Sequence, residues 1–86
     1  MPPISHIFNL QVRDTPGVLV RVAQVFGRRG CNITSLHVEP NADGTWSTMT
    51  IAAHNVPHPA QIQLQLEKLI DVGSAALKTI TKESNS

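Results

Sequence analysis

The chain has 86 residues, enough for one domain with a modest core, and its formal net charge is +1 at pH 7. Aromatic residues make up 3% of it and no basic cluster extends beyond Arg28-Arg29, which excludes an electrostatic surface for nucleic acid. No apolar run approaches the roughly 20 residues of a membrane span and no secretory signal pattern is present, so we expect a soluble, cytoplasmic protein. A domain this small buries only about 60% of its unfolded surface, and we therefore expect an oligomer.

The first strand is predicted from His6 to Arg13, after an N-terminal tail over residues 1–5. Apolar and polar residues alternate along this stretch, which is typical of a strand with one buried face. The residues expected on the buried face are His6, Phe8, Leu10 and Val12.

An amphipathic helix is predicted from Pro16 to Arg29. Thr15 is a helix N-cap type, and Pro16 suits the first helical position because its missing N–H is no loss there. Gly30 lies where a glycine ends a helix. Val20 points toward the polar side, either as an ordinary exposed valine or as part of a partner contact. The apolar stripe consists of Val18, Val22, Val25 and Phe26.

The start of this helix is a candidate site for a carboxylate. Gly17 has no side chain, so the N–H groups of the first turn, unpaired within the helix and at its positive end, are open to a negative group. The alternative is that Gly17 serves only close packing or helix entry.

The second strand is predicted from Asn32 to Glu39 and the third from Thr45 to His54. Pro40–Gly44 between them is expected to form a hairpin turn, because the Asp-Gly pair favours positive φ. The core face of the third strand is expected to hold Ser47, Met49, Ile51 and Ala53.

A second helix is predicted to start near Pro59 or Ala60. The run Gln61–Leu66 also fits a strand, because its apolar and polar residues alternate. Gly73-Ser74 interrupts the pattern, and a short final strand is predicted from Ala76 to Thr81. The helix is expected to bury Ile62, Leu66, Leu69 and Ile70.

The resulting order is strand, helix, strand, strand, helix, strand. It predicts an α+β, ferredoxin-like domain over residues 6–81, with a four-stranded antiparallel sheet, both helices on one face and a disordered tail over residues 82–86. The second strand normally lies at a sheet edge in this topology, so we expect a homodimer that pairs edge to edge.

The sequence gives little indication of a disulfide, a metal site or a catalytic site. Cys31 is the only cysteine, so no intrachain disulfide is expected, and its thiol is interpreted as a small buried hydrophobe. His54 and His58 are four apart, but the neighbouring prolines oppose a shared helical face, and we expect no metal site. No nucleophile has a local signature, so we expect no enzymatic activity. The fold alone also fits nickel-sensing regulators and a small acyl phosphate hydrolase.

Four segments resemble the ACT domain, the small regulatory module that binds amino acids in metabolic enzymes. Asp14–Leu19, with its Pro-Gly-Val-Leu after an acidic residue, is typical of ACT domains in general. The segments Val25–Leu36, Met49–Ile51 and Leu66–Val72 are narrower and resemble the small regulatory subunit of acetohydroxyacid synthase (acetolactate synthase). The resemblance extends from Ile7 to about Val72 and is to the short, single-ACT type or to part of a longer member.

The resemblance implies a non-catalytic regulatory subunit. In that family two domains pair side by side, and a branched-chain amino acid, typically valine, lies between the first loop of one protomer and the start of the second strand of the other. The ligand signals allosteric feedback inhibition to a separate catalytic subunit, which carries thiamine diphosphate, magnesium and FAD. No cofactor is expected in this chain itself.

A zwitterionic, apolar amino acid needs donors for its carboxylate, acceptors for its ammonium group and an apolar slot. The backbone N–H groups of Gly17, Val18 and Leu19 offer the donors, and the Asn32 amide suits either charged end. Val18, Leu19 and Ile33 are expected to line the slot. The predicted ligand-binding residues are Asp14, Pro16, Gly17, Val18, Leu19, Asn32 and Ile33.

Asp14 departs from the asparagine that many of these regulatory subunits carry, although aspartate is common in ACT domains at large. It would accept a hydrogen bond from the ligand ammonium but would repel a nearby carboxylate. Its alternative role is to brace the helix start, and that of Asn32 is a turn residue. Arg28-Arg29 is either a solvated pair at a helix C-terminus or a contact with the catalytic subunit.

Two other functions stay open. The first is a stand-alone ACT protein that senses another amino acid or regulates another enzyme. The second is an activating subunit that no longer responds to ligand. The choice among valine, leucine and isoleucine, and the surface that meets a catalytic subunit, are also open.

Overall fold

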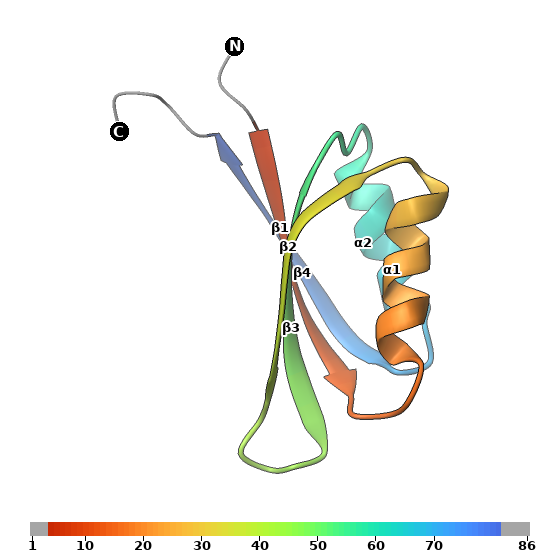
Figure 1. Ribbon diagram of the computed structural model, residues 1–86, viewed down its shortest axis with the longest axis vertical. Helices are drawn as coiled ribbons and strands as arrows, with labels where there is room; N and C mark the ends of the chain where they lie inside the picture. Colours follow the sequence, from red (N-terminus) through yellow and green to blue (C-terminus); the bar gives the residue numbers. More distant parts are fainter. Residues whose placement is uncertain (1–3, 82–86) are drawn as a thin grey trace.

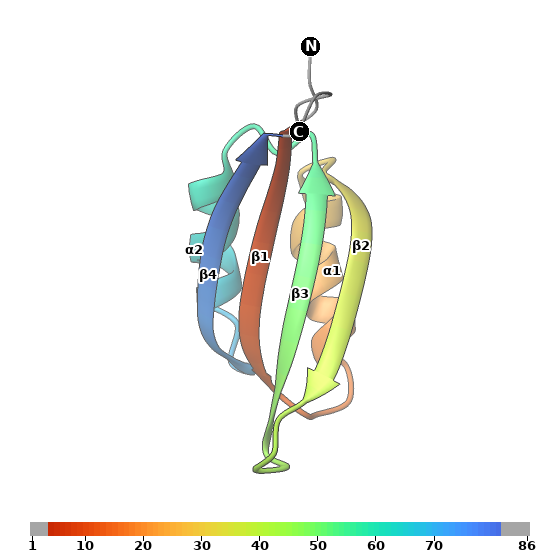
Figure 2. The same cartoon turned by 90° about the vertical axis from the view of Figure 1, so that its left-hand side faces the viewer.

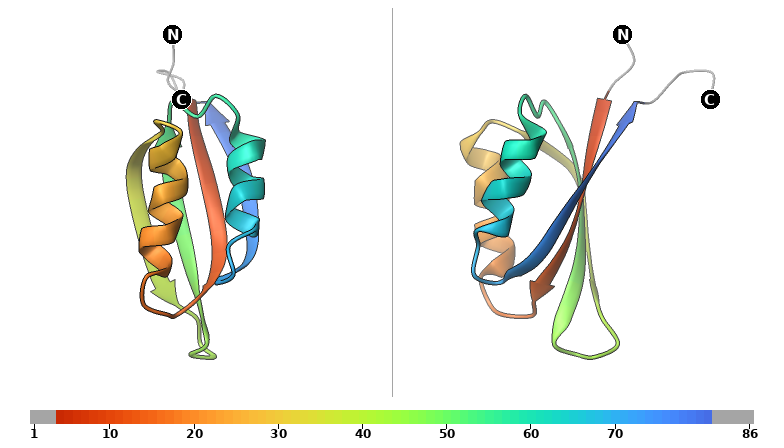
Figure 3. Two further views of the ribbon diagram at one scale, coloured as in Figure 1. Left: turned by 90° about the vertical axis from the view of Figure 1, so that its right-hand side faces the viewer. Right: turned by 180° about the vertical axis from the view of Figure 1, so that it is seen from behind.

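The computed structural model describes residues 4–81, which form one four-stranded sheet and two helices (Figure 1). The strands lie in the order β2-β3-β1-β4 and every neighbouring pair is antiparallel. Both helices cover one face of the sheet (Figure 3), and the other face is uncovered (Figure 2). This is the predicted ferredoxin-like arrangement. The elements are β1 (Ile4–Arg13), α1 (Val18–Arg28), β2 (Asn32–Pro40), β3 (Trp46–His54), α2 (Pro59–Glu67) and β4 (Val72–Thr81).

The core lies between the helices and the covered face of the sheet. Phe8 of β1 and Phe26 of α1 meet edge to face, with ring centroids 5.1 Å apart and planes at 82°. The alternation predicted for β1 is confirmed at Phe8, Leu10 and Val12, which are buried, whereas His6 is only half-buried. On β3 the buried set is Ser47, Met49, Ile51 and Ala53, as predicted.

α1 begins two residues later than predicted. Pro16 and Gly17 form a turn, and Gly17 is the N-cap residue with φ +87°, a left-handed conformation that suits glycine. Among the described residues no side chain caps the start of the helix, so the prediction that Thr15 does so is wrong. This turn reverses the chain, because the helix must run back over the sheet after β1 has ended.

The other end of α1 follows the sequence prediction. Gly30 has φ +68°, and its N–H donates to the carbonyl of Gly27 over 3.2 Å. The N–H of Cys31 donates to the carbonyl of Phe26 over 3.1 Å. These two bonds form a Schellman motif, in which a left-handed glycine ends the helix and satisfies its last carbonyls.

α2 is a helix, which excludes the alternative of a strand over 61–66. Ile62 and Leu66 are buried as predicted, and Leu69 packs partly against the core. The prediction for Ile70 is wrong, because the helix ends at Glu67 and leaves Ile70 in the following turn with 92% of its surface exposed.

β4 is longer than predicted, because it pairs with β1 along nearly its whole length. Gln11 pairs with Ser74 and Val12 with Val72, so Gly73 is an extra residue in a bulge and does not end the strand. A Cβ on Gly73 would lie 2.8 Å from the indole ring of Trp46, so the bulge lets this ring pack against the backbone. β1 also starts early, at Ile4 instead of His6.

A polar cluster on the uncovered face ties the β2–β3 hairpin to β1. The Gln11 side-chain amide donates to the Thr48 hydroxyl over 2.9 Å, Thr48 donates to Asn41 over 2.8 Å, and Asn41 donates back to Gln11 over 2.7 Å. The three side chains therefore satisfy one another without a charged group.

The predicted tails lie largely outside the described residues. Positions 1–3 of the N-terminal tail and all of the tail over 82–86 fall there. Within residues 4–81, no helix is both long enough and apolar enough to span a membrane.

Candidate functional site

The loop between β1 and α1 is fixed to the ends of the neighbouring strands. The N–H of Arg13 donates to the carbonyl of Asp71 over 2.8 Å, and that of Asp14 to the carbonyl of Thr45 over 3.3 Å. The N–H of Thr15 turns back to the carbonyl of Arg13 over 2.9 Å. The loop is therefore anchored to the chain just before β4 and just before β3.

Backbone donors are open at the start of α1. The N–H groups of Gly17, Leu19 and Val20 make no hydrogen bond to any residue in the range 4–81. That of Val18 reaches the carbonyl of Thr15 over 3.4 Å, a long and weak contact. The sequence predicts Gly17, Val18 and Leu19 as donors but not the amide of Val20, because the helix is predicted to start at Pro16.

The side chains of the predicted slot are divided between core and surface. Val18 is buried in the core, so its side chain does not face a ligand. Leu19 is 45% exposed, and Ile33 is half-buried and packs against the core. Asp14 and Pro16 are exposed on the loop. Of the three apolar residues predicted for the slot, Leu19 and Ile33 have solvent-exposed surface and Val18 does not.

The two halves of the predicted site lie at opposite ends of α1 (Figure 1). The loop Asp14–Gly17 precedes the helix, and Asn32 and Ile33 follow it at the start of β2. A helix of 11 residues is about 16 Å long, so one copy of the chain does not bring the two halves together.

Arg21 is a charged residue beside the loop, and it is not among the residues that the sequence predicts for the site. Its guanidinium makes an ion pair with Asp71, just before β4. A Cβ placed on Gly17 would lie 3.4 Å from the Nη1 atom of Arg21. The signal in the sequence is the spacing of four residues between Gly17 and Arg21, which places Arg21 one helical turn from the open N–H groups.

At the far end of α1, Arg29 faces α2. Its Nη1 donates to the Gln61 side-chain carbonyl over 3.2 Å, and both Arg28 and Arg29 are exposed. Arg28 lines a shallow groove with Val25 and Gln65. The arginine pair is therefore solvated and partly engaged with α2.

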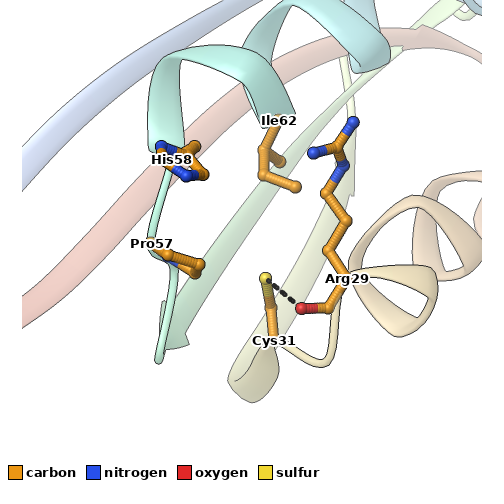
Figure 4. A pocket seen from close by; sticks show the side chains of 5 residues that line it. All are labelled: Arg29, Cys31, Pro57, His58 and Ile62. Carbon is orange, nitrogen blue, oxygen red and sulfur yellow. Dashed lines mark hydrogen bonds between the residues drawn. The ribbon is translucent and has the colours of Figure 1, made fainter.

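Cys31 lies at a cavity of about 240 Å³ between the end of α1 and the start of α2 (Figure 4). Its thiol contacts the carbonyl of Arg29 at 3.9 Å. Burial raises the pKa of the Cys31 thiol, against a smaller opposing effect of the Arg29 charge, so it stays protonated and weakly nucleophilic near neutral pH. This agrees with the interpretation of Cys31 as a buried hydrophobe. The cavity is lined by Arg29, Cys31, Pro57, His58 and Ile62.

Side chains able to hold a metal ion do not gather in the described part of the chain. Over residues 4–81 there is no group of three or more His, Cys, Asp or Glu side chains close enough to share an ion. His54 ends β3, and His58 comes directly before α2.

Solved structures share this fold at low sequence identity. The ACT domain of a GTP pyrophosphokinase from Chlorobium tepidum superposes with a TM-score of 0.68 at 16% identity, covering 91% of this chain and 100% of that one. The regulatory subunit of aspartate kinase from Thermus flavus gives 0.69 at 21% identity, covering 91% and 52%.

Relatives found by sequence similarity identify the family more narrowly than the solved structures do. The acetolactate synthase small subunit of Mycobacterium leprae is 42% identical over 83 residues, which are 95% of this chain and 47% of that protein. The probable acetolactate synthase small subunit of Methanothermobacter thermautotrophicus is 44% identical over 73 residues, which are 84% and 44%. The chain thus spans less than half the length of these curated relatives. Residues 8–74 match the model of the AHAS small subunit-like ACT domain, AHAS being acetohydroxyacid synthase. The chain therefore belongs to this family of ACT domains.

Proposed function

We propose that this chain is a non-catalytic regulatory subunit of acetohydroxyacid synthase. It binds a branched-chain amino acid, valine, between two copies and transmits feedback control to a separate catalytic subunit. The relatives named as acetolactate synthase small subunits support the regulatory role. The catalytic partner carries thiamine diphosphate, magnesium and FAD, and this chain carries none of them.

The open donors at the start of α1 carry the proposal. Three N–H groups that have no partner among residues 4–81 lie at the positive end of an 11-residue helix, and they favour a carboxylate. Arg21 adds a full positive charge beside them. An α-amino acid supplies a carboxylate of the right size, and the exposed side chain of Leu19 suits an apolar side chain next to it.

The edge strand β2 supplies the second half of the site. Within residues 4–81, β2 pairs only with β3, and Leu36 and Val38 on it are partly exposed. It runs from the end of α1 toward the end of the sheet that holds the β1–α1 loop (Figure 2). Antiparallel pairing of β2 with β2 of a second copy brings Asn32 of one copy toward the β1–α1 loop of the other. The homodimer thus completes the site that one copy leaves divided.

Asp14 and Asn32 are assigned to the ammonium group. The Asp14 carboxylate accepts a charge-assisted hydrogen bond, and the Asn32 side-chain oxygen accepts a second from the other protomer. Leu19 and Ile33 contact the aliphatic side chain. Because Asp14 would repel a carboxylate, it fixes the orientation of the ligand, with its carboxylate at the helix start.

Calorimetric titration of the purified protein tests the ligand assignment. Valine, leucine, isoleucine, serine and phenylalanine are titrated in parallel, and we expect saturable binding of branched-chain amino acids only. Binding of serine or phenylalanine instead of the branched-chain amino acids supports the second candidate, a stand-alone ACT protein that senses another amino acid. The aspartate at position 14, in place of the asparagine of many regulatory subunits, favours this candidate. Binding of none contradicts the amino-acid site and leaves an activating subunit.

Copurification tests the partner. A tagged chain expressed in its native cells is expected to retain a large thiamine diphosphate enzyme, and added valine is expected to lower acetolactate formation by that complex. Recovery of a different enzyme contradicts the assignment to acetohydroxyacid synthase but not the amino-acid site.

A further inference from the structure

The Arg21–Asp71 ion pair joins parts of the chain that are 50 residues apart. Arg21 lies on the first turn of α1, and Asp71 lies between α2 and β4. The Asp71 carbonyl also accepts the N–H of Arg13, directly before the loop. Asp71 is thus bonded to residues on both sides of the β1–α1 loop. Its carbonyl accepts the N–H of Arg13, and its carboxylate pairs with Arg21.

The Arg21 guanidinium lies between Asp71 and the start of α1. Its Nη2 faces the Asp71 carboxylate, while its Nη1 lies 3.4 Å from the point where a Gly17 Cβ would be. Guanidinium carries five N–H donors, and the pair with Asp71 uses only one side of them. A carboxylate at the open N–H groups of Gly17 and Leu19 would therefore lie next to the same cation.

A ligand carboxylate and Asp71 would share this one positive charge. The two carboxylates repel each other, and each is stabilised by the guanidinium. The Arg21 side chain is 46% exposed, so little packing energy holds it on Asp71 and the pair is easily exchanged.

The Arg21–Asp71 pair is one of several contacts that hold the turn Lys68–Asp71, beside the backbone hydrogen bonds of Leu69 and Val72. Among the described residues, Asp71 is the only member of the turn whose side chain makes a hydrogen bond or ion pair. The turn carries Ile70, the most exposed large apolar side chain in residues 5–79. It borders a cavity of about 390 Å³ that Arg21, Lys68, Leu69, Ile70 and Asp71 line.

We propose that Arg21 is shared between Asp71 and the carboxylate of the bound amino acid, so that ligand binding loosens the Arg21–Asp71 pair and weakens one of the contacts that hold the turn carrying Ile70. This inference rests on the proposed amino-acid site. Arg21 contacts the ligand. Asp71 is a positioning residue: by pairing with Arg21 it lowers the affinity of the site for the amino acid. Because coupling is reciprocal, weakening the pair tightens ligand binding, and ligand binding weakens the pair.

Titration of Asp71→Asn with valine tests the sign of the coupling. Asp71→Asn is expected to bind valine at least about fivefold more tightly than the unmodified protein. Arg21→Gln is expected to bind it at least about tenfold more weakly, through loss of a charge-assisted contact. Glu67→Gln is the matched control, because Glu67 is exposed, makes no ion pair in the described part of the chain and changes the net charge equally. Its affinity is expected to be unchanged.

Valinamide separates this effect from a structural one. It replaces the carboxylate of valine with a neutral amide, so Asp71→Asn is not expected to tighten its binding. A merely structural role for Asp71 predicts that Asp71→Asn weakens the binding of both ligands.

Hydrogen exchange in the unmodified protein tests the turn without any substitution. The amides of Leu69 and Val72 donate to Leu66 and Leu69 over 3.1 Å each. Saturating valine is expected to speed exchange at these two amides and to slow it at Gly17 and Leu19.

The outcomes separate the two proposals. Unchanged or weaker valine binding by Asp71→Asn, or slower exchange of the turn with valine, overturns the shared role of Arg21 and leaves the amino-acid site standing. Absence of valine binding by the unmodified protein overturns the valine site, and the shared role falls with it.

Discussion

At the scale of single residues, Gly17 has the most constrained position in the candidate site. Its φ of +87° reverses the chain between β1 and α1, and its lack of a side chain leaves room for Arg21 and keeps the helix start open. A substitution there adds backbone strain as well as any new charge. A charged substitution at Gly17 must therefore be compared with an uncharged one that carries the same backbone strain.

Gly17→Asp and Gly17→Asn form such a pair. Both side chains tolerate a left-handed conformation, but only aspartate places a carboxylate beside Arg21 and the open N–H groups. We expect Gly17→Asp to bind valine at least about tenfold more weakly than Gly17→Asn, a difference of about 1.4 kcal/mol. Calorimetric titration measures both, with thermal unfolding to check that each is folded. Equal affinities of the two variants for valine would contradict the placement of the ligand carboxylate at the start of α1.

At the scale of elements, two glycines have opposite surroundings. Gly73 lies in the bulge of β4, where a Cβ would come within 2.8 Å of the Trp46 ring. Gly27 lies inside α1, where a Cβ would meet nothing within 4 Å. The Trp46 ring also has the Arg13 guanidinium 4.9 Å from its centroid, so Gly73, Trp46 and Arg13 form one packed contact across the end of the sheet.

The same glycine-to-alanine change is therefore expected to act in opposite directions at the two sites. Gly73→Ala forces the Trp46 ring to move and lowers the free energy of unfolding by about 1–3 kcal/mol. Gly27→Ala raises it by about 0.5–1 kcal/mol, because alanine is the better helix former. Denaturant unfolding followed by tryptophan emission measures both, since Trp46 is the only tryptophan and the chain has no tyrosine. Unchanged emission and stability in Gly73→Ala would contradict the contact with Trp46.

At the level of the whole molecule, the proposed homodimer depends on the edge strand β2. One copy has the loop at one end of α1 and Asn32 at the other. Val38 is 42% exposed on β2, and Val20 is 58% exposed on the outer side of α1. The two valines offer matched tests of the edge and of the helix face as the site of contact.

Val38→Lys is expected to shift the protein from dimer to monomer in sedimentation, because a lysine on an edge strand opposes strand addition. It is also expected to weaken valine binding, since the site then lacks Asn32 of the partner. Val20→Lys is expected to sediment and bind as the unmodified protein does. Dissociation by Val20→Lys alone would instead place the interface on the helix face.

Features that depend on residues near one another in the chain could be predicted from the sequence. Alternation in β1 and β3, the apolar stripe of α1 and the left-handed glycine at Gly30 each express a local geometric repeat or a local φ. The motif segments were also local, which is why the family could be recognised from them. Within the candidate site, Gly17 and the open N–H groups of Gly17 and Leu19 could likewise be predicted from the local sequence.

Features that depend on contacts between residues far apart in the chain could not be predicted from the sequence. The start of α1 at Val18 follows from the direction in which the helix must return over the sheet, and the length of β4 follows from its pairing with β1. Ile70 is exposed because the chain must turn there to enter β4. Arg21 meets Asp71 across 50 residues of sequence, and no periodicity records a contact at that separation.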